Sequence, residues 1–347
     1  MSRVPLRIAV VGLVHDHIWG VLRGFAQCER ADVVAAADPN QPLLDKIAQE
    51  AGVTAGYAEY EEMLDSEELD GVLCYTENSR HAEVVEACAA RGLHVQCEKP
   101  MADRLANADR MLAAARDAGI KLMINYPSTW SAALHHAKQL IEEGAIGQVC
   151  QLRDHHAHAG PKEIGCSEYF YSWLYDASRN GAGALMDYCC YGAKICTWFL
   201  GKPNSVIATA ARLYKDYIDV EDNAFILMSY DNAYGIAEAS WTQIGPLPEH
   251  GPVINGSAGT IIVRRGEVWL ATTQDKEGST IKSPELPPNW RTPAEYFSWC
   301  ITEDVEPEGP TSAQLCRDAQ EILEAGILSV ERNARVELPL TDYRPSV

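Results

Sequence analysis

The sequence has no surplus of basic residues. Its 29 lysines and arginines face 49 aspartates and glutamates, so the formal net charge is −20 at neutral pH. Nucleic acids and anionic membrane surfaces are bound by basic patches, which a strongly acidic chain offers poorly. We therefore expect no nucleic-acid partner and no membrane partner.

The sequence also lacks long apolar runs and paired cysteines. No segment approaches the roughly 20 apolar residues that a membrane-spanning helix needs, and the apolar run near the N-terminus is brief. The 11 cysteines are odd in number and include no C-x-x-C pair. Several lie inside apolar stretches, which is typical of free thiols in a reducing compartment. We expect a cytoplasmic protein without a signal peptide.

A complete dinucleotide fingerprint is missing too. The segment RIAVVGLVHDHIWG (residues 7–20) predicts a strand, a turn and a helix, the setting of the G-x-G-x-x-G motif. Gly12 supplies the first glycine, whereas Val14 and His17 occupy the second and third positions. The helix N-terminus still presents free N–H groups to a phosphate, and Asp16 is placed to cap it.

The first third of the chain alternates strands and helices. Apolar segments that end near residues 11, 38, 76, 98 and 125 are separated by helical patterns of 10 to 15 residues. Apolar strands joined by such helices predict a doubly wound parallel sheet, the Rossmann-type α/β fold, over residues 1–125. Asp38 follows the second strand, about 20 residues beyond the fingerprint, where an acidic residue bonds the adenosine ribose. This position favours NAD over NADP.

The remaining residues, 126–347, predict a second domain of α+β type. Several strands joined by tight turns indicate a large, mostly antiparallel open sheet. An apolar sheet face that few helices can cover suits a homo-oligomer, either a dimer or a tetramer. A late helix over about 311–332 is expected to pack back on the first domain. The proline-rich segment 281–296 is expected to be a surface loop.

Three motifs, in this order and at these spacings, resemble the glucose-fructose oxidoreductase / myo-inositol dehydrogenase (Gfo/Idh/MocA) family. The first is YTENSRHAEVVEACAARGLHVQCEKPMA (75–102), the second IEEGAIGQV (141–149), and the third GAGALMDYCCYGAKICTWFLG (181–201). The resemblance implies NAD(P)-dependent oxidation of a CH–OH group. It also implies catalytic roles for Lys99, Asp187 and Tyr191.

The resemblance further implies a set of cofactor-binding residues. Together with the loop and the end of the second strand, the set comprises Gly12, Val14, His15, His17, Asp38, Thr76, Asn78, His81, Glu98 and Lys99. Glu98 is expected to bond the nicotinamide ribose, and Asn78 and His81 to lie along the cofactor crevice. With Val14 and His17 in place of glycines, the pyrophosphate is expected to shift outward, or the two histidines to contact the cofactor or the substrate.

Oxidation of a secondary alcohol needs a group that takes the hydroxyl proton while hydride leaves carbon. A tyrosine can do this when a nearby cation favours its phenolate. Tyr191 with Lys99 fits that role, and Asp187 shares its helix face at i, i+4. Lys194 is placed to hydrogen-bond a substrate hydroxyl.

Histidines and aromatic residues complete the expected substrate site. His156 and His158 share one strand face, and Trp130 and Trp173 offer flat surfaces to a sugar ring. No cysteine or carboxylate trio near these histidines completes a metal site, so none is expected.

The leading interpretation is an NAD-dependent oxidoreductase of a sugar, cyclitol or glycoside. One alternative is a redox-neutral hydrolase or lyase, in which tightly held NAD oxidises a glycoside transiently. Another is a non-catalytic sensor or subunit on the same scaffold.

Overall fold

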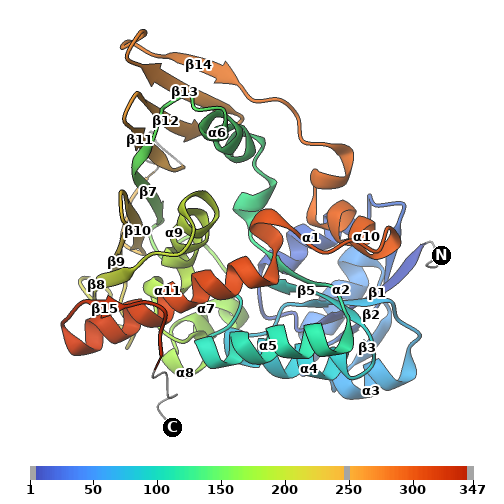
Figure 1. The fold of residues 1–347 in the computed structure, drawn as a ribbon. Helices are drawn as coiled ribbons and strands as arrows, with labels where there is room; N and C mark the ends of the chain where they lie inside the picture. The colour runs from blue at the N-terminus through green and yellow to red at the C-terminus, as the bar shows by residue number, and fades with distance from the viewer. Residues whose placement is uncertain (1–4, 246–250, 342–347) are drawn as a thin grey trace.

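The computed structural model describes residues 5–245 and 251–341. Two sheets organise the chain, a parallel one near the N-terminus and a larger one formed by the middle of the sequence (Figure 1). The second sheet lies beside the first domain, with helix α11 (Ala313–Arg332) running between them.

The first sheet is parallel throughout, with strand order β3-β2-β1-β4-β5-β6. This order is that of the dinucleotide-binding fold, and it confirms the predicted doubly wound domain. Its strands are β1 (Leu6–Val11), β2 (Ala31–Ala37), β3 (Ala55–Tyr57), β4 (Gly71–Cys74), β5 (His94–Glu98) and β6 (Leu122–Asn125). The connecting helices are α1 (His17–Phe25), α2 (Gln41–Ala51), α3 (Tyr60–Ser66), α4 (His81–Ala89), which follows the 3-10 turn η1 (Asn78–Arg80), and α5 (Leu105–Ala118).

The apolar pattern of the sequence does not predict one strand–helix unit of this domain, β3 and α3. β3 and α3 are three and seven residues long, and β3 lies at the sheet edge. A short, half-exposed edge strand carries little apolar periodicity, so the sequence signal is weak.

The second sheet has nine strands in the order β14-β13-β12-β11-β7-β10-β9-β8-β15. Only the β7–β10 pair is parallel among these neighbours, which confirms the mostly antiparallel sheet. The strands are β7 (Val149–Ala157), β8 (Ser205–Ala211), β9 (Asn223–Ser229), β10 (Tyr234–Ser240), β11 (Val253–Gly256), β12 (Gly259–Arg264), β13 (Glu267–Thr272), β14 (Ser279–Lys282) and β15 (Val336–Glu337).

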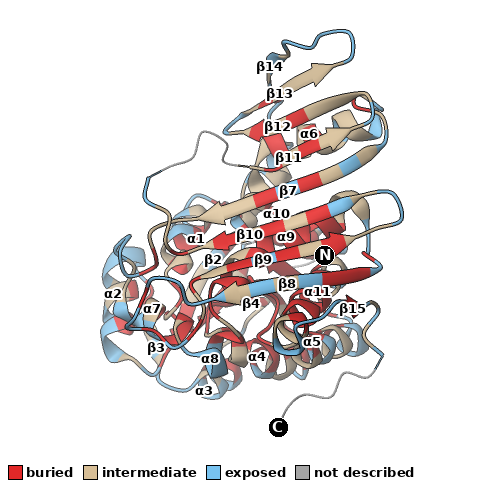
Figure 2. Cartoon of the chain, turned by 90° about the vertical axis from the view of Figure 1, so that its left-hand side faces the viewer, coloured by how far each residue is buried: buried red, intermediate tan, exposed pale blue. Residues whose placement is uncertain are grey.

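One face of this sheet is covered by helices. α9 (Ala184–Leu200) packs on β7 and β10, α11 packs on β8, and α6 (Ala132–Glu142) packs on β12 and β13. Two shorter helices, α7 (Glu168–Leu174) and α8 (Ala177–Asn180), follow β7. The strands seen from the other side carry alternating buried and exposed residues (Figure 2).

The prediction that segment 281–296 is a surface loop is wrong in part. The segment contains the end of β14, the 3-10 turn η3 (Pro288–Trp290) and the start of α10 (Pro293–Thr302). α10 packs on α1, where Tyr296 and Phe297 are buried in the core on one face of the parallel sheet. Proline is compatible with the first turn of an α-helix, so the high proline content of this segment did not exclude α10.

α11 behaves as expected, because it packs on α5 and α9. Arg317 of α11 forms an ion pair with Asp109 of α5. The last third of the chain therefore covers the first domain on two sides. None of the helices within 5–245 and 251–341 has the length and apolarity to cross a membrane.

Candidate active site

The ends of β1 and β4 meet so closely that only glycine fits at the first fingerprint position. Gly12 has φ +82°, and a Cβ there would come within 2.6–2.8 Å of Thr76 atoms. The positive φ and the close approach both exclude a larger residue. The backbone thus forms a cradle at the carboxyl ends of the strands, where this fold binds ligands.

A cavity of about 450 Å³ lies at this cradle, lined by Gly12, Val14, Asp38 and Thr76 among others. Asp38 is 2% exposed, and its Oδ2 accepts a hydrogen bond of 2.6 Å from the Leu13 N–H. Burial raises the pKa of the Asp38 carboxyl. Asp38 therefore holds the loop after β1 and forms part of the cavity wall. Each carboxylate oxygen has more than one acceptor site, so a ribose hydroxyl can still bind there.

The same cavity has walls that sequence reasoning missed. They come from α3, η1, α7, α8 and the adjoining segment, and include Tyr60, Arg80, Tyr169, Ser172 and Arg179. Trp173 was expected against the substrate, but it is 1% exposed and lines this first cavity. No local signal marks these residues, because a helix of the second domain brings several of them over the first.

The two histidines of the divergent loop occupy different environments. His15 is 1% exposed and packs against Phe170 and Trp173, with ring centroids 4.4 and 5.6 Å away. Burial lowers the pKa of His15 well below its ordinary value, so the ring is neutral. The Nδ1 atom of His17 lies 3.1 Å from Oε1 of Glu98. His17 therefore contacts the Glu-Lys-Pro segment, whereas His15 packs the loop against α7.

The expected capping role of Asp16 is wrong. Asp16 stands at the N-cap of α1 without a side-chain capping bond. Its two carboxylate oxygens instead accept hydrogen bonds from the backbone N–H and hydroxyl of Ser167, each 2.7 Å long. This contact joins the loop to the second domain.

Asn78 and His81 lie beneath the crevice and are absent from the linings of the described cavities. Both side chains have 0% exposure. The Asn78 amide donates to Asn180 at 2.7 Å, and His81 Nδ1 lies 3.2 Å from the Met101 carbonyl. The structure thus gives them core positions that support the site from below.

Lys99 and Asp187 form a buried ion pair across the two domains. The distance from Lys99 Nζ to Asp187 Oδ1 is 2.6 Å, and the two side chains are 2% and 5% exposed. The peptide bond between Lys99 and Pro100 is cis. Burial alone would lower the pKa of Lys99, but the carboxylate of Asp187 outweighs it and raises the pKa. Burial alone would raise the pKa of Asp187, but Lys99 holds it below its usual value.

Tyr191 lies beside this ion pair. Lys99 Nζ lies 5.1 Å from the centroid of the Tyr191 ring, over its face. Burial raises the pKa of Tyr191 well above its ordinary value, with Cys190 and Glu98 adding to the effect. The Lys99 ammonium donates to Asp187 and faces the ring of Tyr191, and the acid–base role of Tyr191 stays a prediction.

A second cavity, of about 500 Å³, has Tyr188, Tyr191, His156 and Asp154 in its wall. The His156 ring stacks on Tyr191 with centroids 4.1 Å apart and an angle of 7° between the planes. Its Nδ1 lies 2.9 Å from Oδ2 of Asp154, which is 1% exposed. A carboxylate on Nδ1 fixes the tautomer that leaves Nε2 with a free lone pair.

His158 is partly buried, like His156, whereas Lys194 is fully buried. The His158 ring lies 4.8 Å from that of Tyr188, and burial lowers the pKa of His158. Lys194 is 0% exposed and donates to the hydroxyls of Ser128 and Thr129 in the 3-10 turn η2 (Pro127–Trp130), both at 3.2 Å. Burial lowers the pKa of Lys194 to about 8. Lys194 thus holds the turn beside the cavity.

Trp130 lines a third cavity together with His17 and Asn125. Its Nε1 donates to Asn125 Oδ1 at 3.0 Å, and Asn125 in turn donates to Glu98 at 2.9 Å. The chain of bonds connects Trp130 with the Glu-Lys-Pro segment.

Comparison with known proteins places both halves of the chain in one family. Residues 6–126 match the family described as "Oxidoreductase family, NAD-binding Rossmann fold", and residues 134–262 match "GFO/IDH/MocA C-terminal domain".

Characterised relatives and a solved structure show similarity over most of the chain. It is 28% identical to D-xylose 1-dehydrogenase [NADP(+)] of Haloarcula marismortui, over 87% of this chain and 85% of the relative. It is 25% identical to myo-inositol 2-dehydrogenase of Thermotoga maritima, over 79% and 80%. The structure of an oxidoreductase from Agrobacterium radiobacter with NAD+, L-tartaric acid and magnesium superposes with a TM-score of 0.81 at 20% identity, covering 96% of this chain and 98% of that one.

Proposed function

The chain belongs to the Gfo/Idh/MocA family of NAD(P)-dependent oxidoreductases, and from this premise we propose that it transfers a hydride between NAD and a ring hydroxyl of a sugar, cyclitol or glycoside. Its relatives include dehydrogenases named for xylose and for myo-inositol, both polyhydroxylated substrates.

The observation that carries the proposal is the buried Lys99–Asp187 pair beside a cavity walled by aromatic rings. Aromatic faces pack on the C–H faces of sugar rings, and a fixed ammonium group stabilises the negative charge that develops on the reacting oxygen. Because Asp187 holds Lys99 in a single position, the ammonium is aimed without a reorganisation cost.

Bound NAD would accept the hydride on its nicotinamide ring, and the first cavity, beside Asp38, offers a place for its adenosine ribose. Gly12, Thr76 and Asp38 line that cavity, and the cradle between Gly12 and Thr76 leaves room only for backbone. A negative Asp38 carboxylate bonds ribose hydroxyls and repels a 2′-phosphate, which supports NAD. Glu98 bonds His17 and Asn125, so these three residues are placed to contact the nicotinamide ribose.

His156 is the best-placed proton acceptor. The substrate hydroxyl gives its proton to Nε2 of His156 while its carbon loses hydride, and Asp154 stabilises the resulting imidazolium through Nδ1. Tyr191 supports the ring of His156 by stacking and has its own hydroxyl to orient the substrate. In this arrangement the imidazole beside the helix takes the acid–base role that the sequence assigns to Tyr191.

The first experiment is a turnover assay of the purified protein with NAD and a panel of sugars, cyclitols and glycosides. We expect NADH to accumulate, and Lys99→Met to reduce kcat by about 10²-fold or more. Lys121→Met is the matched control, because Lys121 is also largely buried but pairs with Asp304 and Glu306. Wild-type turnover by Lys99→Met would refute the catalytic role of Lys99. Glycoside cleavage without NADH accumulation would instead favour the redox-neutral reaction.

The second experiment tests the proton acceptor with a matched pair on one strand. His156→Gln removes the imidazole in the cavity, whereas His155→Gln removes its neighbour on the opposite strand face, which bonds Glu238. We expect His156→Gln to lower kcat by a larger factor than His155→Gln does. If His155→Gln lowers kcat as much, or His156→Gln keeps the wild-type kcat, the role of His156 is refuted.

A homo-oligomer is also part of the proposal. Ile207, Phe225 and Tyr234 lie on β8, β9 and β10 and are 43%, 48% and 54% exposed. Adjoining residues of these strands line a shallow cavity of about 490 Å³. An apolar sheet face of this kind suits a self-complementary contact between two copies.

A further inference from the structure

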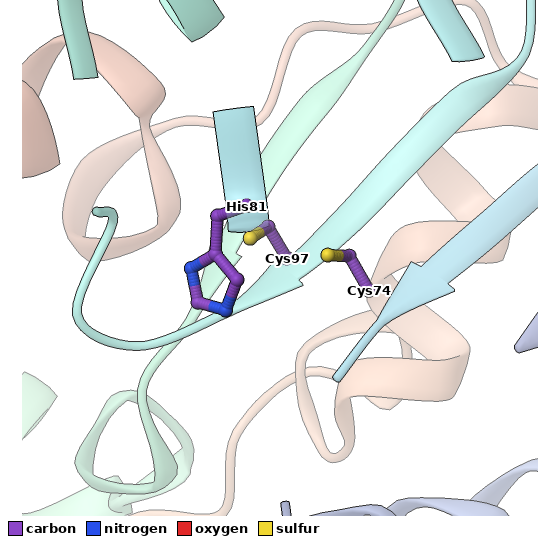
Figure 3. A group of neighbouring side chains, drawn as sticks. All are labelled: Cys74, His81 and Cys97. Atoms are coloured by element: carbon purple, nitrogen blue, oxygen red, sulfur yellow. The ribbon is translucent and has the colours of Figure 1, made fainter. Parts of the chain in front are cut away.

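A cluster of three potential metal ligands lies beneath the crevice, apart from the groups assigned above. Cys74 ends β4, Cys97 stands at its register partner on β5, and His81 begins α4 (Figure 3). All three residues have 0% exposure. Their ligand atoms, two sulfurs and one ring nitrogen, all lie within 4.8 Å of one another. The three side chains converge from different elements.

The imidazole of His81 is oriented as a metal ligand would be. Its Nδ1 lies 3.2 Å from the Met101 carbonyl, an acceptor that fixes the proton on Nδ1. Nε2 then carries a free lone pair, and it is buried without a hydrogen-bond partner in the described residues. Ligating histidines commonly donate their other ring N–H to a backbone carbonyl in this way. A buried acceptor without a donor costs free energy that a bound cation would recover.

We propose that Cys74, Cys97 and His81 supply three ligands of a structural Zn²⁺ ion, which carries one enclosed water molecule as its fourth ligand. Two thiolates, one neutral imidazole and a dication sum to zero charge, which a site closed to water favours because burial of net charge is costly. The donor set of sulfur and imidazole is one that zinc prefers, whereas Mg²⁺ and Ca²⁺ take oxygen ligands. A monovalent soft ion would leave a net negative charge in the core.

The distances allow this coordination after a small movement. Tetrahedral zinc with ordinary bond lengths places its sulfur and nitrogen ligands about 3.5–3.8 Å apart, against the present limit of 4.8 Å. Side-chain rotations that move the ligand atoms by up to about an ångström bring all three within bonding distance of one ion.

A second cluster, His15, His17 and Glu98, fits a metal less well. Nδ1 of His15 accepts the His17 backbone N–H, and Nδ1 of His17 already lies against Glu98. Those bonds use the lone pairs or the donors that a metal would require. The buried sulfur cluster has the open acceptor, and it is the stronger candidate.

The position of the ion gives it a structural role. It would join the ends of β4 and β5 to the start of α4. Cys97 lies two residues before Lys99, and Cys74 lies two residues before Thr76. The ion would therefore stabilise the positions of the catalytic lysine and of the backbone around Gly12 and Thr76. Because the site is closed, we expect zinc to enter during folding rather than to exchange with the native protein.

The test measures metal in protein that has been refolded with or without zinc. Wild-type protein is unfolded with reductant, refolded with equimolar Zn²⁺, washed with chelator and analysed by plasma mass spectrometry. We expect about one zinc ion per chain, and less than a tenth of that for Cys74→Val. Cys88→Ala is the matched control, because Cys88 is an equally buried thiol outside the cluster. It should retain the ion.

Refolding with Co²⁺ gives a readout that needs no variant. Thiolate coordination produces intense near-ultraviolet charge-transfer absorption, which surface carboxylates do not produce. Wild-type protein that retains neither Zn²⁺ nor the cobalt absorption would overturn the proposal, and so would a Cys74→Val protein that retains as much zinc as the wild type. Turnover with NAD is a separate assay, so failure of the zinc site leaves the proposed dehydrogenase function standing.

Discussion

Lys194 offers a quantitative test of the interior electrostatics of the site. It is 0% exposed, and its ammonium has hydroxyl partners rather than a carboxylate. Burial lowers the pKa of Lys194 to about 8, whereas an unfolded lysine titrates near 10.4. Below pH 8 the native state therefore bears the cost of a buried charge.

The sign and size of the effect follow from proton linkage. Between about pH 8 and 10.4 the unfolded chain holds a proton that the native protein has lost, so stability rises with pH. At about 1.4 kcal/mol per unit of pKa, the full cost is about 3 kcal/mol, and about 2 kcal/mol of it is relieved between pH 7 and pH 9.5. Lys194→Met removes this titration and keeps a side chain of similar length.

The assay is urea unfolding of wild type and Lys194→Met at pH 7 and at pH 9.5. We expect the wild type to gain about 2 kcal/mol relative to the variant over that interval. Lys282→Met, at an exposed lysine, should show no such change. A difference between wild type and Lys194→Met that stays constant within about 0.5 kcal/mol would refute the reasoning.

Three further predictions address the ion pair, the cofactor and the oligomer. Asp187→Asn leaves Lys99 buried without its counter-ion and should destabilise the protein by about 3–5 kcal/mol in urea unfolding; a loss below 1 kcal/mol would contradict the pair's structural role. Asp38→Ser removes the charge that repels a 2′-phosphate and should narrow the preference for NAD over NADP by at least about tenfold in kcat/KM, and an unchanged ratio would argue against Asp38 as the discriminator. Phe225→Lys on the outer sheet face should shift a dimer or tetramer toward monomer in light scattering, whereas Tyr214→Lys, 80% exposed and outside the strands, should not.

Regular apolar patterning made the first domain predictable. Its strands are buried on both faces, so each appears as a short apolar run, and the helices between them have the length that parallel connections need. The same logic located Asp38, because residues at the carboxyl ends of parallel strands line the ligand site, whereas Lys99 was identified through the family resemblance. Two elements were not predicted. β3 is a short edge strand with little apolar periodicity, and α10 follows a proline-rich stretch.

The amino-acid sequence by itself determined the parallel sheet and its strand-end residues, since both depend on local periodicity, and it contains the motifs that resemble the family. Only the tertiary structure decided the chemistry of the site. Lys99 and Asp187 are 88 positions apart, and His156 meets Tyr191 only because β7 packs against α9. Trp173 reaches the first cavity because a second-domain helix folds over the first domain. A side chain's pKa and partners depend on what burial brings beside it, and burial is a property of the folded chain rather than of its local sequence.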